Sequence, residues 1–340
     1  MNGYGGSILR VNLSTGKIAK EPTPPELARD FIGGRGFGAY LLFKEVPQGA
    51  DPLGPENKLI ISSGPLSGLL IPGAGKCDFA CKSPLTGGYA SASLGGLFTA
   101  EVKYAGLDSI ILEGASPKPV YLFIDDDKIE LCDASSLWGK GAITVEKELK
   151  EKLGEEFQIV CVGPGAENGV LYAHINHDYG RQAGRGGVGT VMGAKKIKAI
   201  AIRGTKSIPV ADMAAYRQAG MKLYDACKRS ELLKPWQHWG TTMVVSWCDE
   251  IGALPTRNFA AGSFGRQDAL RSRDTRANRH HRQGMLWLSV AVWQVQPDET
   301  VRHAGRRSRV RNHWHGRIEF GNFRCRRCRA GKLFVRRVGH

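Results

Sequence analysis

The segment from Arg181 to Gly193 constrains the chain most strongly, because its sequence, RQAGRGGVGTVMG, places five glycines and two arginines within thirteen residues. Glycine lets the backbone take positive φ and approach a ligand closely, and exposed amides and arginine forks bind phosphate oxygens. A helix that begins there would add its positive end. We therefore predict an anion-binding loop and the main cofactor contact of the chain. The alternative is a tight glycine-rich turn that only connects a strand to a helix.

Two nucleotide-binding fingerprints fit this loop poorly. Residues 184–189 satisfy GxGxxG, but a Rossmann fingerprint also needs a preceding strand and an acidic residue about 20 positions later. Leu171–Ile175 is a candidate strand, whereas the next acidic residue, Asp212, comes only after a second candidate strand has ended. The loop also lacks the Gly-Lys-Ser/Thr of a Walker A motif. Phosphate binding is better supported than NAD binding, which stays an alternative.

The positive charge of the chain is concentrated at its C-terminal end. Residues 265–340 contain 18 Arg and one Lys against five acidic residues, so they carry +14 of the formal net charge of +16. This part shows no sustained periodicity of 2 or 3.6 residues. A basic tail of this kind can bind nucleic acid. The preceding 264 residues are nearly neutral and read as a globular protein.

No hydrophobic run reaches transmembrane length, and residues 1–20 lack the apolar core of a signal peptide. Eight cysteines at irregular spacing favour reduced, buried thiols over a disulfide framework. We therefore expect a cytoplasmic protein that does not enter a membrane. The only CxxC pair, Cys325 and Cys328, has no partner pair, and Asp125–Asp127 lacks the glycine and distal glutamate of a calcium loop. The sequence as written therefore predicts no metal ligands.

Alternating and helical patterns follow one another along the first 209 residues. Strands are expected at 7–13, 58–62, 73–82, 89–93, 109–113, 120–124, 128–131, 158–162 and 196–203, and helices at 97–104 and 143–153. Gly95 and Gly96 open the first of these helices as a second glycine pair suited to an anion. Lys76, in the strand 73–82, can point at a ligand. The pattern predicts an α+β domain, with a helical region after Pro209.

Several stretches together carry a resemblance to a known family. They are GGSILRVNLSTGKI at the start, ENKLIISSGPLSG at 56–68, KSPLTGGYASASLGG at 82–96, AGRGGVGTVMGAKKIKAIAIRG at 183–204 and GALPTRNF at 252–259. In these residues the chain resembles the N-terminal part of the tungsten-containing aldehyde ferredoxin oxidoreductase family. The resemblance covers about residues 3–263.

The resemblance implies an N-terminal domain of two β-sheets with flanking helices over residues 1–209, the start of a helical domain over 210–264, and a tail from 265 that does not fit the family. It implies a tungsten bis-pterin cofactor (tungstopterin) beside a [4Fe–4S] cluster. Lys76 and Ser93 stand where the family commonly has Arg and Asn; lysine retains the charge but not the bidentate fork. The residues implied to lie against the pterins and their phosphates are Lys76, Ser93, Gly95, Arg181, Ala183, Gly184 and Arg185. The glycine-rich pattern itself adds Gly96, Gly186 and Gly187 to the predicted cofactor contacts.

The implied reaction is oxidation of an aldehyde to a carboxylic acid, with two electrons passing through tungsten and the cluster to ferredoxin. Metal and pterin carry the chemistry, while the protein positions them. No residue before 265 is a candidate for proton transfer, so no catalytic residue is assigned. Homodimers are common in such families. The alternatives are the catalytic subunit of a related tungsten enzyme such as benzoyl-CoA reductase, an NAD-dependent dehydrogenase, and a nucleic-acid binder acting through the tail.

The family continues after GALPTRNF to a C-x2-C-x3-C cluster motif that this chain does not contain. Read one nucleotide later, codons for residues 283–294 permit KGCYGCPLRCG, which has that spacing. The junction of Met285 and Leu286 is forced to a cysteine codon, since ATG is followed by C or T. Our hypothesis is that the reading frame slips by one nucleotide near Phe264–Gln267. We then expect the polypeptide as written to be inactive and incompletely folded, without stoichiometric tungsten and iron.

Sequencing of the coding DNA tests this hypothesis. The shifted frame should contain three cysteine codons between residues 285 and 293 and run on without an early stop. A shifted frame that lacks these codons, or soon meets a stop, would show that the basic tail is a selected sequence.

Overall fold

A computed structural model describes residues 1–69, 71–264, 281–284 and 291–295. The chain divides into two compact units, the first running from Met1 to Ser230 and the second beginning at Glu231. The predicted boundary at residue 209 and the predicted tail remain predictions. Most of residues 265–340, including Cys325 and Cys328, lies outside the described residues. Within the described residues, no helix is both long and apolar enough to cross a membrane.

The first unit begins with a hairpin and two helices and then alternates strands with short helices. Its elements are β1 (Ser7–Asn12), β2 (Lys17–Pro22), α1 (Pro25–Phe31), α2 (Arg35–Glu45), β3 (Leu59–Ser63), β4 (Lys76–Lys82), β5 (Tyr89–Gly95), α3 (Phe98–Tyr104), β6 (Leu107–Glu113), β7 (Val120–Asp125), β8 (Lys128–Asp133), η1 (Ser135–Leu137), α4 (Ala142–Leu153), β9 (Gln158–Cys161), α5 (Pro164–Glu167), β10 (Ile175–His177), β11 (Arg181–Ala183), α6 (Val188–Ala194), β12 (Ile197–Arg203) and α7 (Met213–Arg229).

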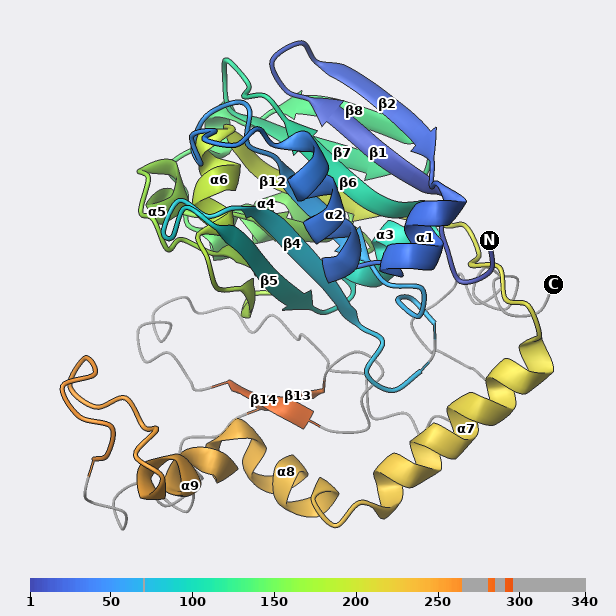
Figure 1. Cartoon of the computed structure of the whole chain (residues 1–340), viewed down its shortest axis with the longest axis vertical. Coiled ribbons are helices and arrows are strands. Elements are labelled where there is room, and N and C mark those ends of the chain that lie inside the picture. The colour runs from blue at the N-terminus through green and yellow to red at the C-terminus, as the bar shows by residue number, and fades with distance from the viewer. Residues whose placement is uncertain (70, 265–280, 285–290, 296–340) are drawn as a thin grey trace. The chain divides into compact units, whose positions relative to one another are not determined.

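Two six-stranded sheets form the body of this unit (Figure 1). Their strand orders are β2-β1-β6-β3-β4-β5 and β11-β10-β9-β12-β7-β8. One neighbouring pair in each sheet is parallel, β1 with β6 and β12 with β7, and the others are antiparallel. Two mixed sheets with flanking helices confirm the predicted α+β class.

The alternation along each strand decides which layer its side chains enter. In β3, Leu59 and Ile61 join the core shared by the two sheets, whereas Ile60 joins the cluster beneath α1 and α2. The shared core also takes Phe98 from α3 and Met192 from α6. On the other side, α4 covers the second sheet, where its apolar residues pack on β7, β9 and β12. Both sheets are therefore covered on both faces, which explains why their central strands read as continuous apolar runs.

One expected strand lies elsewhere in the structure. Leu171–Ile175 was predicted to be a strand, but β10 contains only its last residue and continues to His177. The carbonyls of Leu171 and His174 instead approach Gly187 and Gly189, where a Cβ would lie 2.2 and 2.4 Å from them. The backbone packs against the glycine-rich start of α6 and cannot at the same time pair in the sheet.

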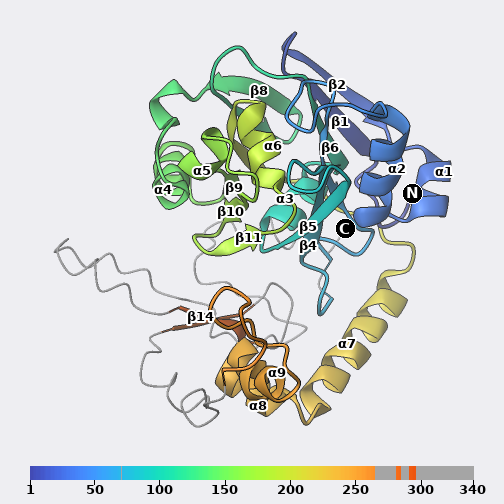
Figure 2. The same cartoon turned by 60° about the vertical axis from the view of Figure 1, so that its left-hand side comes forward.

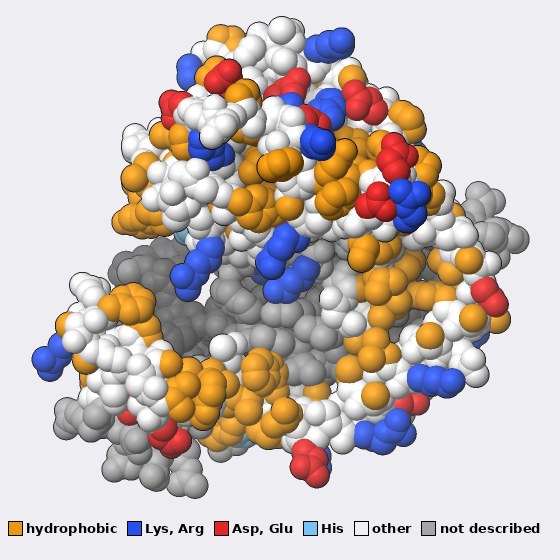
Figure 3. All heavy atoms as spheres, in the orientation of Figure 1, with side chains coloured by type: hydrophobic (Ala, Val, Ile, Leu, Met, Phe, Trp, Pro, Cys, Tyr) orange, Lys and Arg blue, Asp and Glu red, His pale blue; other side chains and the backbone are white. Residues whose placement is uncertain are grey.

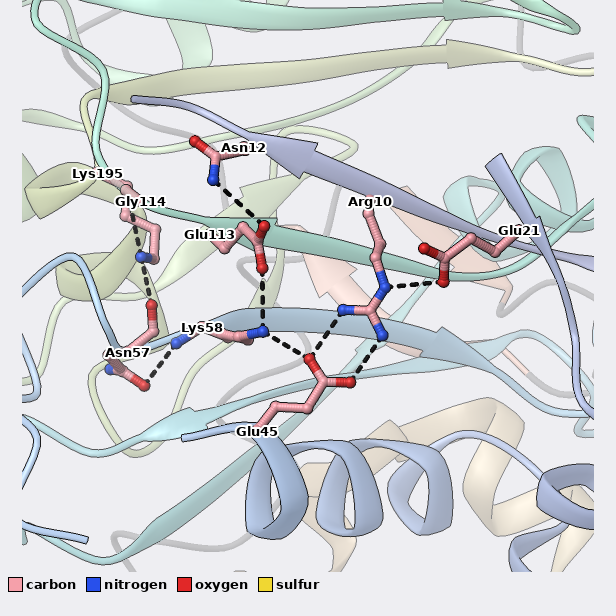
Figure 4. Close-up of polar contacts among 9 residues, drawn as sticks. All are labelled: Arg10, Asn12, Glu21, Glu45, Asn57, Lys58, Glu113, Gly114 and Lys195. Atoms are coloured by element: carbon pink, nitrogen blue, oxygen red, sulfur yellow. Dashed lines mark hydrogen bonds and ion pairs between the residues drawn. The ribbon is translucent and has the colours of Figure 1, made fainter. Parts of the chain in front are cut away.

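A network of ion pairs holds the end of α2 against the first sheet (Figure 4). Arg10 on β1 makes a bidentate pair with Glu45, with N–O distances of 2.7 and 2.8 Å. Lys58 joins the same carboxylate to Glu113 at the end of β6. Burial alone would raise the pKa of Glu45, but hydrogen bonds and charges from Arg10 and Lys58 outweigh it and lower the pKa to about 2.

Replacement of Glu45 by Gln should lower the free energy of unfolding at pH 7 by about 2 kcal/mol, a value reduced for partial exposure. A carboxyl whose folded pKa is depressed contributes stability that is complete above its ordinary pKa of about 4.5 and is lost as the pH falls toward 2. The difference between the wild type and Glu45→Gln in urea unfolding should therefore shrink between about pH 5 and pH 2.

The control is Glu151→Gln, which removes the same charge from an exposed pair with Lys147. It should change stability by less than about 0.5 kcal/mol at any pH. Equal effects of the two substitutions would refute a special role for the Glu45 network.

Beside this network, the buried Lys195 donates to the carbonyls of Asn57 and Gly114, with an Nζ–O distance of 2.8 Å to Gly114 (Figure 4). Asn57 lies just before β3, and Gly114 follows β6, so the end of α6 is bound to two strands of the first sheet. Burial lowers the pKa of Lys195 to about 8.

The second unit is mainly helical in its described part. Asp249 is buried there and accepts hydrogen bonds from Ser263 Oγ and Phe264 N, which fix the turn after the last helix. Two strands of this unit fall within the predicted tail and pair antiparallel with each other. The elements of this unit are α8 (Leu233–Trp239), η2 (Gly240–Val244), α9 (Val245–Glu250), β13 (His281–Gly284) and β14 (Ala291–Val295).

Candidate functional site

The register of β4 and β5 brings several predicted residues onto one face of the first sheet. Lys76 lies opposite Gly95, and Asp78 lies opposite Ser93. Directly paired residues share a face, so Lys76, Ser93 and Gly95 lie on the same side. The side chains of Lys76 and Ser93 are exposed. Asp78 is buried on the same side and accepts a 2.7 Å hydrogen bond from Ser91, with Ser93 Oγ at 3.5 Å.

Arg181 reaches this face from the second sheet. Its strand, β11, lies against β5 (Figure 2). A Cβ built on Gly95 would lie 3.8 Å from Nη1 of Arg181. The Arg181 side chain is 8% exposed, and its Nε donates to Asp178 at 3.0 Å. The guanidinium is thus held by a local pair while one edge of it lies beside bare glycine backbone.

Gly96 allows the two sheets to approach at this point. Its φ is +114°, which side chains rarely adopt. A Cβ there would lie 2.6 Å from the His177 ring and 3.0 Å from Cδ of Arg181. Any residue larger than glycine would force β10 and β11 away from the turn after β5.

The loop that follows β11 divides into an open and a packed half. Gly184 and Arg185 are exposed, and a Cβ on Gly184 would meet nothing within 4 Å. Gly186 is packed instead: its carbonyl accepts a 2.9 Å hydrogen bond from Ser83, and its Cβ would lie 2.6 Å from that of Ala90. The packed half also contains Gly187, where φ is +76°. The alternative interpretation of this loop, a tight turn that only connects a strand to a helix, therefore describes residues 186 and 187 well but not residues 184 and 185.

We call Lys76, Gly95, Gly96 and Arg181 the glycine–arginine face. The structure brings these four together, with Ser93 two residues before Gly95 on β5, while Ala183 is buried at the end of β11. Sequence reasoning missed His177 and Asp178, which contact Gly96 and Arg181, and Ser83, which donates to the carbonyl of Gly186. His177 directly precedes Asp178 and lies three positions before Gly180, but its contact with Gly96 spans 81 positions and has no periodic pattern.

The glycine–arginine face suits an anion that needs close backbone approach. Within the described residues Lys76 and Arg185 make no ion pair. Figure 3 shows Lys and Arg side chains along the edge of the first unit where β5 ends. Lysine and arginine side chains without an acidic partner, placed beside glycine backbone, form the kind of site that binds phosphate groups. The residues present therefore fit a phosphate-bearing cofactor.

The connection through residues 184–189 is not a Rossmann unit. β11 pairs antiparallel with β10, and β9 lies between β10 and β12 with antiparallel pairing on both sides. β11 and β12 therefore run in opposite directions, whereas a dinucleotide-binding crossover joins parallel strands. The GxGxxG pattern here therefore lies outside a Rossmann crossover.

The described residues contain no group of three or more His, Cys, Asp or Glu that could hold a metal ion. Burial raises the pKa of the Cys77 and Cys81 thiols to about 12, so both stay protonated. Asp125–Asp127 forms the turn between β7 and β8, where Asp125 pairs with Arg203 and Asp127 with Lys20 and Lys206. These carboxylates are neutralised by cations of the chain.

The two mixed sheets and the cationic, glycine-lined face define an α+β domain that offers an anion an exposed surface. The chain belongs to the family described as "Aldehyde ferredoxin oxidoreductase, N-terminal domain", which it matches over residues 8–204. It is 47% identical over 270 residues to a tungsten-containing aldehyde ferredoxin oxidoreductase of Thermococcus kodakarensis and 45% identical over 270 residues to that of Pyrococcus furiosus. These alignments cover 78% of this chain and 44% of each relative, so the chain spans less than half of their length.

The chain is also similar to a more distant relative and to a solved structure whose names describe other enzymes. The chain is 35% identical over 259 residues to the WOR-like subunit of an aliphatic sulfonate oxidoreductase of Pyrococcus furiosus. It also superimposes with a TM-score of 0.77 and 30% identity on a chain of the active site complex BamBC of benzoyl coenzyme A reductase, covering 88% of this chain and 48% of that one. The family resemblance expected from the sequence is confirmed.

Gly96→Ala should lower the free energy of unfolding by about 3 kcal/mol, because the added methyl meets a buried ring and the φ of +114° strains any side chain. Gly184→Ala is the matched control, since its Cβ enters open space; it should change stability by less than about 1 kcal/mol. Urea unfolding monitored by circular dichroism measures both. Equal stability of the two variants would mean that the sheets do not meet at Gly96.

Proposed function

We propose that the glycine–arginine face binds the phosphates of a tungsten bis-pterin cofactor, in a protein that oxidises aldehydes to carboxylic acids. The observation that carries the proposal is the Arg181 guanidinium beside the bare backbone of Gly95, directly opposite Lys76. The support for this particular cofactor is the 47% identity to an enzyme named as tungsten-containing.

Two kinds of residue in this chain would bind that group. The basic side chains supply positive charge, and the glycines allow phosphate oxygens to reach the backbone. Arg181 offers a fork already oriented by Asp178, while Lys76 and Arg185 add point charge at the exposed rim. Gly95 and Gly184 let phosphate oxygens approach backbone amides, since neither carries a side chain. Ser93, Gly96, Ala183, Gly186 and Gly187 complete the proposed binding set: Ser93 offers a hydroxyl, and the other four fix the backbone.

The bound tungsten and pterins would supply the two-electron chemistry. We include in the proposal a [4Fe–4S] cluster, whose cysteine ligands the sequence as written lacks, and ferredoxin as the electron acceptor. No described residue of the first unit is assigned a proton-transfer role. The contribution of this unit is to hold the cofactor phosphates and to cover one side of the group.

A second candidate function is that of a subunit related to benzoyl coenzyme A reductase, which the structural similarity favours. The higher identity to the aldehyde oxidoreductases, 47% against 30%, ranks it below the first candidate. Both candidates place the same cofactor class on the same face.

Arg181→Gln should weaken pyrophosphate binding to the full chain at least about tenfold in isothermal titration calorimetry, because a charge-assisted hydrogen bond contributes about 1.5–3 kcal/mol. Pyrophosphate serves as the probe for paired phosphate groups. Anaerobically prepared pterin cofactor should compete with it.

Arg29→Gln is the control, since Arg29 is an exposed arginine paired with its neighbour Asp30 on α1. It should leave the affinity unchanged within about twofold. Absence of binding by the wild type, or equal loss in both variants, would refute the anion site. Pyrophosphate binding that pterin cofactor cannot displace would refute the cofactor class alone.

A further inference from the structure

His177 occupies the contact between the two sheets behind the glycine–arginine face. It is the last residue of β10 and is fully buried. Its Nδ1 lies 2.8 Å from the carbonyl of Ile159 on β9, and the backbone N–H of Phe98 donates to its Nε2 at 3.4 Å. Both ring nitrogens are therefore used, one toward β9 of the second sheet and one toward the start of α3, which follows β5.

These two partners fix the protonation state of the ring. A backbone amide can only donate, so Nε2 must keep its lone pair, and Nδ1 must carry the proton that bonds to Ile159. Burial lowers the pKa of His177 to about 4; Lys150 on α4 and Arg181 on β11 act in the same direction, while the Ile159 carbonyl and Asp178 oppose them. The ring is neutral at physiological pH, and Arg181 carries the positive charge next to it.

The ring also determines where the Gly95–Gly96 turn can lie. Its Cδ2 and Nε2 fill the position at which a Gly96 Cβ would stand, and Cδ of Arg181 lies along the same side. The Phe98 ring meets the imidazole edge-on, with centroids 6.1 Å apart, and extends the contact into the shared core. Turn, ring and arginine stem form one packed stack, so a displacement of the ring would move both anion-binding elements.

We propose that His177 is a positioning residue for the anion site: by accepting the Phe98 amide and donating to Ile159, it holds the Gly95–Gly96 turn at the distance from Arg181 that a phosphate group needs. This inference rests on the proposed function. The ring itself touches no ligand, because backbone and Arg181 lie between it and the face. Its role is to join a turn of one sheet to the arginine of the other.

Two substitutions separate the two hydrogen bonds of the ring. Gln at position 177 can place an oxygen near the site of Nε2 and keep an acceptor for Phe98, whereas Asn reaches only the site of Nδ1 and keeps the donor to Ile159. Pyrophosphate affinity of the full chain is measured by calorimetry at pH 7.5, at a temperature where circular dichroism shows each variant folded. We expect His177→Gln to bind within about threefold of the wild type and His177→Asn about tenfold more weakly.

A second measurement needs no variant. In wild-type chain labelled with ¹⁵N-histidine, the ring should give the signals of a neutral imidazole protonated at Nδ1 down to about pH 5, and the Nε2 resonance should shift when pyrophosphate is added. Signals of a ring protonated at Nε2 would contradict the two hydrogen bonds on which the proposal rests. This signal keeps the proposal testable if His177→Asn does not fold.

The outcomes distinguish this inference from the proposed function. If the wild type binds no pyrophosphate, both fall. If the wild type binds but the Gln and Asn variants bind equally well, and the Nε2 resonance does not respond, only the positioning role of His177 falls. Rescue by Gln together with a response of Nε2 supports the proposal.

Discussion

The contact of the His177 ring with Gly96 is the constraint on which the candidate site depends. Two sheets that are each covered on both faces can meet closely only where one of them lacks a side chain, and Gly96 supplies that place. Because β11 follows β10 by a short turn, the same contact carries Arg181 to the end of β5. The candidate site is therefore a consequence of how the sheets pack. A buried guanidinium lies there beside a neutral ring, and Lys76 and Arg185 add exposed charge.

Much of the fold could be predicted from local patterns. The alternation in β1 and the apolar runs in β3 and β6 gave strands with nearly correct bounds, and glycine pairs marked the turns before α3 and α6. The prediction for Leu171–Ile175 was wrong because the segment is apolar enough for a strand, while its carbonyls are needed against the glycines of α6. Periodicity reports only the local preference of a segment. Here the conformation of residues 171–175 depends on their contact with the glycines at the start of α6.

The glycines and arginines of the candidate site could be predicted from the sequence, but the residues that pack behind them could not. Residue type alone indicates that Gly95, Arg181 and Gly184 suit an anion. His177 contacts Ile159 and Phe98, which are 18 and 79 positions away, and its neighbouring residues carry no pattern that predicts these contacts. The chain belongs to the aldehyde ferredoxin oxidoreductase N-terminal domain family, and the packing behind the glycine–arginine face explains how this chain builds that face with its own residues.

A crystal structure of the full chain grown with pyrophosphate tests the central claim most directly. The account predicts phosphate density within hydrogen-bonding distance of the Arg181 guanidinium and the Gly95 backbone, on the side where Lys76 is exposed. Pyrophosphate bound on another face, or an Arg181 side chain turned away from the end of β5, would contradict it.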